Sequence, residues 1–83
     1  MEFIAEIKVM PLKELLDPQG KAVSGSLHQL GLGTITDVRI GKNITLNISA
    51  ESREKASAVA DAAARQLLSN PVMEVYEIDL RQN

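Results

Sequence analysis

The sequence predicts an α+β fold, a two-layer sandwich in which two helices cover one face of an antiparallel sheet, ferredoxin-like in outline. Three stretches alternate apolar and polar residues as strands do, at 3–10, 34–49 and 72–80. Two stretches between them carry apolar residues at helical spacing. The order is βαββαβ if the middle stretch folds as a hairpin. The 83 residues form a single domain, 1–83.

The first strand is predicted from the unbroken alternation over 3–10. Asp17-Pro18 then predicts a helix start, because aspartate is a good N-cap and proline at the first helical position loses no needed hydrogen bond. Gly31 predicts the end of this helix as a left-handed residue. Its apolar stripe consists of Val23, Leu27 and Leu30.

The middle stretch, 34–49, leaves two interpretations open. Gly41-Lys42-Asn43 suits a tight hairpin turn between two strands. The alternation continues in phase across these residues, however, so one long bent strand fits as well. We favour the hairpin, which gives the sheet four strands.

The second helix is predicted from a cap at Ser52 to about Ser69, and Asn70-Pro71 stops it. Alanines in its inner stripe allow close approach to the sheet. This stripe is expected to be Ala56, Val59, Ala60, Ala63 and Leu67.

The sheet face opposite the helices is not cleanly polar. Five apolar residues are expected there: Ile4, Met10, Ile35, Met73 and Val75. An open apolar face on so small a domain predicts self-association through these residues, as a homodimer or homotetramer.

The composition excludes several functions. The net charge is −2, basic residues are scattered, and only Phe3 and Tyr76 are aromatic, so a nucleic-acid groove is not expected. There is no cysteine for a thiolate–metal site. No apolar run approaches the roughly 20 residues that span a membrane, and the start does not resemble a signal peptide. We therefore expect a cytoplasmic protein with no membrane or nucleic-acid partner.

Catalytic chemistry is poorly supported by the residues. His28 is the only histidine, and no orienting acid accompanies it and the nearby Ser24 and Ser26. Gln19-Gly20-Lys21-Ala22 resembles the end of a phosphate loop but lacks the earlier glycine and the Ser/Thr after the lysine. We expect no catalytic residue, no metal site and no cofactor in this chain.

Two polar segments are not required by the core: Asp17-Pro18-Gln19-Gly20-Lys21 and Asp37-Val38-Arg39-Ile40-Gly41-Lys42. A glycine in the first turn of a helix costs roughly 0.5–1 kcal/mol relative to alanine. We infer that another group approaches the backbone of Gly20 closely. The residues alone leave open whether these segments form a binding surface or ordinary turns.

In this order and separation, the two segments resemble the PurS family, the small subunit of multi-subunit phosphoribosylformylglycinamidine synthase. The pattern comprises Leu-Leu-Asp-Pro-Gln-Gly-Lys-Ala at 15–22 and Asp-Val-Arg-Ile-Gly-Lys at 37–42. The helix end at 67–72 and the acidic Glu-Val-Tyr-Glu at 74–77 complete it. The resemblance covers essentially the whole chain.

The resemblance implies a role in purine biosynthesis, in an enzyme that uses ATP and glutamine to convert formylglycinamide ribonucleotide to formylglycinamidine ribonucleotide. In the family, the glutaminase subunit PurQ releases ammonia, and the synthetase subunit PurL uses ATP and Mg²⁺ for the amidation. PurS bridges them as a dimer or higher oligomer and contributes no catalytic residue. The implied partner interface comprises Asp17, Gln19, Gly20, Lys21, Asp37, Arg39, Gly41 and Lys42.

A second hypothesis is a small-molecule-sensing regulatory domain of a metabolic enzyme, because βαββαβ sandwiches often bind effectors at oligomer interfaces. The sequence does not decide which segment faces which partner, or whether a nucleotide sits at the interface.

Overall fold

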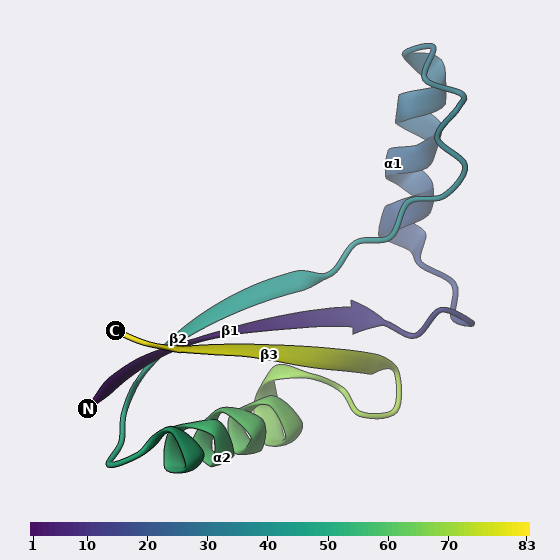
Figure 1. The fold of residues 1–83 in the computed structure, drawn as a ribbon. Helices are drawn as coiled ribbons and strands as arrows, with labels where there is room; N and C mark the ends of the chain where they lie inside the picture. Colours follow the sequence, from purple (N-terminus) through teal and green to yellow (C-terminus); the bar gives the residue numbers. More distant parts are fainter.

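The computed structural model describes all 83 residues and has an antiparallel sheet of three strands at its centre (Figure 1). The elements follow in the order β1 (Glu2–Pro11), α1 (Pro18–Gln29), β2 (Lys42–Ser49), α2 (Arg53–Ala63), the short π-helix η1 (Ala64–Leu68) and β3 (Glu74–Gln82). β1 is the central strand, and β2 and β3 are the two edges. The predicted α+β class, with an open antiparallel sheet and two helices, is confirmed.

β1 supplies most of the core, because its alternation turns one apolar set of side chains toward α2. The antiparallel register places Ile48 of β2 opposite Phe3 and Ile78 of β3 opposite Ile7. The neighbouring strands therefore extend the same apolar face. The buried residues of β1 are Phe3, Ala5, Ile7 and Val9.

α2 packs on this face through a stripe of alanines. Ser52 caps the helix as predicted, and its side chain accepts a hydrogen bond from the backbone N–H of Lys55 at 3.2 Å. The predicted stripe was wrong at Val59 and Leu67, which are 52% and 83% exposed. An alanine surface lets the helix approach closely, and the large strand side chains fill the space between the layers. The fully buried alanines are Ala56, Ala60 and Ala64.

α1 begins and ends where the sequence predicts. The Asp17 side chain caps its first turn, and Pro18 occupies the first helical position. Gly31 has a left-handed φ of 84°, and the N–H of Leu32 bonds the carbonyl oxygen of Leu27 at 3.1 Å. This is the bond of a Schellman motif, so the predicted C-terminal cap is confirmed.

The position of α1 was not predicted correctly. The helix extends away from the sheet instead of covering it, so α2 alone forms the helical layer (Figure 1). Its apolar stripe is short and stays largely open, with Val23 39% and Leu30 74% exposed. The segment 35–41 returns alongside α1 and gives it a neighbour within the chain (Figure 1).

The predicted hairpin at 34–49 is wrong, and the long bent strand is only partly right. Lys42–Ser49 pairs with β1, whereas residues 35–41 have no regular secondary structure and no partner in the sheet. The chain crosses the end of β1 closely at Gly41, where a Cβ would overlap the carbonyl oxygen of Val9 and the sulfur of Met10. The sheet therefore has three strands instead of the expected four.

The open sheet face is more polar than predicted. By the strand register it carries Ile4, Met10 and Val75, as expected, but charged residues lie between them. Ile35 lies instead in the segment beside α1, and Met73 lies in the turn before β3. Those two positions are corrected, because neither residue belongs to a paired strand. The charged residues of this face are Glu6, Lys8, Glu77, Asp79 and Arg81.

Neither helix has the length and apolarity that crossing a membrane would require.

Candidate partner interface

The two polar segments lie against each other at the base of α1, and we call this region the junction. Asp17 connects them: its Oδ1 accepts a hydrogen bond from Gly20 N at 3.0 Å, and its Oδ2 accepts one from Ile40 N at 2.8 Å. These two backbone N–H groups, helped by the positive charge of Arg39, lower the pKa of Asp17 below its ordinary value of 3.8. The carboxylate therefore fixes the start of α1 against the returning chain.

Gly20 is buried in the same contact. A Cβ at this position would overlap the carbonyl oxygen of Val38. The inference that a group approaches this backbone closely is confirmed, and the group belongs to the second polar segment of the same chain. Gly41 has a similar role at the end of β1.

Arg39 anchors the junction to the end of β1. Its guanidinium donates to the carbonyl oxygens of Pro11 and Leu12, the latter at 2.8 Å. Four of the predicted interface residues thus have a structural role within the chain: Asp17, Gly20, Arg39 and Gly41. Their contact with a partner stays a prediction.

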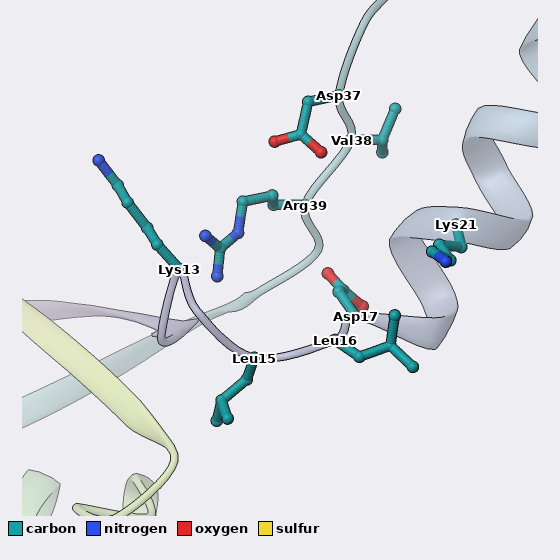
Figure 2. Close-up of a pocket in the computed structure, with 8 residues that line it drawn as sticks. All are labelled: Lys13, Leu15, Leu16, Asp17, Lys21, Asp37, Val38 and Arg39. Carbon is teal, nitrogen blue, oxygen red and sulfur yellow. The ribbon is translucent and has the colours of Figure 1, made fainter.

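The other four predicted residues are exposed: Gln19, Lys21, Asp37 and Lys42. Lys42 lies 4.0 Å from a carboxylate oxygen of Glu74 on β3. Lys21 and Asp37 line a hollow of about 170 Å³ at the junction, and the Arg39 side chain extends from the returning segment toward Lys13 (Figure 2). The hollow therefore joins exposed residues of both segments.

Three further residues line the hollow that the sequence did not single out: Lys13, Leu15 and Leu16 (Figure 2). They belong to the loop between β1 and α1, whose conformation could not be predicted. Leu16 is 67% exposed. The sequence does contain a signal for this surface: Leu15 and Leu16 directly precede the helix cap and belong to no apolar stripe.

His28 does not form a catalytic pair with a serine. Its Nε2 lies 3.0 Å from the carbonyl oxygen of Ile35, an acceptor, so this nitrogen carries a proton. The structure also has no group of three or more His, Cys, Asp or Glu side chains arranged to hold a metal ion.

A second polar cluster ties α2 to β3. The Tyr76 hydroxyl donates to Asp61 Oδ1 at 2.5 Å, and Arg65 Nε donates to Asp61 Oδ2 at 2.8 Å. The hydrogen bond from Tyr76, followed by that from Arg65, lowers the pKa of Asp61 below 3.8. The same bond to Asp61 raises the pKa of Tyr76 above 10.0. The sequence did not single out Asp61 or Arg65, so this connection was missed.

Comparison with known proteins finds one family that matches nearly the whole chain. The model of the PurS family, described as phosphoribosylformylglycinamidine (FGAM) synthase, matches residues 4–82. The PurS subunit of phosphoribosylformylglycinamidine synthase from Bacillus subtilis is 38% identical over 79 residues, which cover 93% of each chain. The Synechocystis PurS subunit is 45% identical over 62 residues, and the matched part is 75% of this chain and 62% of that protein.

The fold agrees with solved structures of this family. A chain in the structure of PurLQS from Thermotoga maritima superimposes with a TM-score of 0.90 and 32% identity, covering 98% of this chain and 99% of that one. The family match, the full-length relative and the fold agree. The chain therefore belongs to the PurS family of phosphoribosylformylglycinamidine synthase subunits.

Proposed function

We propose that this chain is the non-catalytic bridging subunit of phosphoribosylformylglycinamidine synthase in de novo purine biosynthesis. In this role it holds the glutaminase and the ATP-dependent synthetase together and supports ammonia transfer between them. The observation that carries the proposal is the full-length likeness, at a TM-score of 0.90, to a chain of the PurLQS structure. The alternative of a small-molecule-sensing domain is not favoured, because the matching relatives are named as synthase subunits.

The junction supports this role because its backbone is fixed before any partner arrives. Asp17 and Arg39 hold the two segments by hydrogen bonds within the chain. Lys21 and Asp37 are consequently presented from a fixed frame, which reduces the conformational entropy lost on binding. We propose contacts with the synthetase PurL and the glutaminase PurQ, in the cytoplasm, with ATP and Mg²⁺ bound by the synthetase and no cofactor in this chain.

We also propose that the chain is a homodimer or homotetramer. An isolated helix of about 12 residues is only marginally stable in water, yet α1 makes little contact with the sheet. Val23 and Leu30 leave an apolar stripe open along it. A second copy packed on α1 would bury this stripe. The contact predicted through the open sheet face at Ile4, Met10 and Val75 stays a prediction beside it.

Size-exclusion chromatography with light scattering tests the self-association. The double substitution Val23→Glu/Leu30→Glu should lower the measured mass toward that of one chain, because it charges the stripe. Val59→Glu/Leu67→Glu, on exposed positions of α2, is the matched control and should leave the mass unchanged. An unchanged mass in the α1 variant would exclude α1 as the contact between copies.

The bridging role is tested by mixing the chain with purified synthetase and glutaminase subunits. All three should elute together, and omission of this chain should separate the glutaminase from the synthetase. Co-elution of the two enzymes to the same extent without this chain would contradict the proposal.

A further inference from the structure

Three cationic side chains at the junction have no carboxylate partner within the chain. Lys13, Lys21 and Arg39 all line the hollow of about 170 Å³ (Figure 2). None of them takes part in any of the four ion pairs of the structure. Two carboxylates line the same hollow: Asp17, which already accepts hydrogen bonds from two backbone N–H groups, and Asp37, which is exposed. The cations are therefore available to an anion from outside.

Arg39 is held in place for such a contact. One of its terminal nitrogens donates to the carbonyl oxygens of Pro11 and Leu12. Its other N–H donors make no hydrogen bond within the chain, and guanidinium geometry suits a carboxylate in a paired, two-bond arrangement. A fixed guanidinium loses less side-chain freedom on binding than a mobile one.

A second hollow adjoins the cationic one, and its lining mixes apolar residues with two polar ones, Asn70 and Glu74. It measures about 270 Å³ and shares Leu15 and Leu16 with its neighbour. Met73, from the turn before β3, also lines it and is 51% exposed. The two hollows therefore share the β1–α1 loop, with Leu15, Leu16 and Met73 as the aliphatic part of the second and Glu74 as its one carboxylate.

The charge of the cationic hollow selects among anions. Its lining carries three cations and the two carboxylates of Asp17 and Asp37, so its formal charge is +1. One carboxylate neutralises that charge, whereas a phosphate dianion would exceed it and would face both aspartates. The lining therefore favours a protein carboxylate over a nucleotide phosphate.

We propose that this surface binds a segment of a partner synthase subunit in which a carboxylate side chain lies next to an aliphatic one. The carboxylate enters the hollow between Lys21 and Arg39, and the aliphatic side chain packs on Leu16 and Met73. This inference rests on the proposed bridging role and adds the chemistry of the recognised segment.

Two double variants, each of which removes two positive charges, test the role of the cationic hollow. Lys13→Gln/Lys21→Gln removes two exposed cations from the hollow. Arg53→Gln/Lys55→Gln removes two exposed cations at the start of α2, away from the junction (Figure 1). The first should raise the Kd for assembly with the synthetase and glutaminase by ~10–100-fold and flatten its salt dependence. The second should change the Kd by less than about 2-fold.

Equal effects of the two variants, or no effect of the first while the wild-type chain still assembles, would overturn the inference alone. Failure of the wild-type chain to assemble would instead overturn the bridging role. Calorimetric titration of ATP into the isolated chain distinguishes the anion. ATP binding that is lost in Lys13→Gln/Lys21→Gln would identify a phosphate site and overturn the carboxylate assignment.

Carbodiimide cross-linking of the assembled complex locates the partner residue, because the reagent joins a lysine amine only to a carboxylate in direct contact. Mass spectrometry should find Lys13 or Lys21 joined to an aspartate or glutamate of a partner subunit, with an aliphatic residue beside it in the sequence. Cross-links from other lysines to the partners, with none from these two, would contradict the proposal.

Discussion

Gly20 is where the two polar segments meet, and its missing side chain is what allows the contact. Replacing it with alanine would place a Cβ against the carbonyl oxygen of Val38, a backbone atom that cannot turn away. We expect Gly20→Ala to destabilise the fold by ~1–3 kcal/mol, the usual cost of overpacking. Urea unfolding followed by far-ultraviolet circular dichroism measures this cost.

Gly25 is the matched control within the same helix. Nothing lies within 4 Å of a Cβ built there. Gly25→Ala should therefore stabilise the helix by roughly 0.5–1 kcal/mol, since alanine is the better helix former. Equal stabilisation by both substitutions would show that α1 and the segment 35–41 do not pack as described.

Tyr76 reports directly on its hydrogen bond to Asp61, because it is the only tyrosine and the chain has no tryptophan. The bond raises the pKa of Tyr76, so its stabilisation is present below pH 10 and disappears as pH rises through the raised pKa. Absorbance near 295 nm should place the midpoint above 10.0 in the wild type. Asp61→Asn should return the midpoint toward 10.0 by removing the carboxylate.

Asp61, the acceptor in the same hydrogen bond, contributes to stability with the opposite pH dependence. The pKa of Asp61 is lowered, so its contribution is present above pH 3.8 and is lost as pH falls through the lowered value. Asp79→Asn, on the open sheet face, serves as the control for the Tyr76 titration. A wild-type midpoint equal to that of Asp61→Asn would contradict the described hydrogen bond.

At the scale of elements, the alanine surface of α2 determines how closely the helix approaches the sheet. Ala60 is 0% exposed over the strands, whereas Ala58 is exposed on the outer side. Ala60→Leu should cost ~1–3 kcal/mol or more because the added atoms have no space. Ala58→Leu should stay within about 0.5 kcal/mol of wild type in the same urea experiment.

Local signals predicted the elements well because they depend on neighbours in the sequence. The caps at Asp17 and Ser52 and the left-handed Gly31 act within one helical turn, and all three were predicted correctly. The stripe of α2 was mispredicted because two parallel apolar rows lie on one helix. One row contains Ala56, Ala60 and Ala64, and the other contains Val59 and Leu67. Periodicity alone does not tell which of the two rows faces the sheet.

Pairing and docking could not be predicted from the same signals. Alternation over 34–49 describes an extended chain, but it does not say which part has a neighbouring strand. α1 has an apolar stripe, but nothing local specifies whether the sheet, a chain segment or another molecule covers it. The two polar segments were recognised, whereas their mutual contact depends on residues far apart in the sequence, such as Asp17 and Ile40, which are 23 positions apart.

The whole molecule is more extended than a compact domain of its length and buries few of its residues. The radius of gyration is 16.4 Å, whereas a compact domain of this length has about 12 Å. Only 10 of 83 residues are buried, so the chain leaves much of its apolar surface open. Association with a second copy would supply the missing burial.

Stability should therefore depend on protein concentration. Raising the chain concentration tenfold should shift the urea midpoint upward, because the proposed oligomer forms only from native chains. The double substitution Val23→Glu/Leu30→Glu should remove this dependence. A wild-type midpoint that does not change with concentration would show a chain that is stable alone.

As a bridging subunit, this chain is proposed to connect ammonia production by the glutaminase to ammonia use by the synthetase. The most direct measurement is formylglycinamidine ribonucleotide formation by purified synthetase and glutaminase, with and without this chain, using either glutamine or ammonium as the nitrogen source. We predict that glutamine-dependent synthesis requires the chain, whereas ammonium-dependent synthesis by the synthetase changes far less. Equal glutamine-dependent rates with and without the chain would contradict the account.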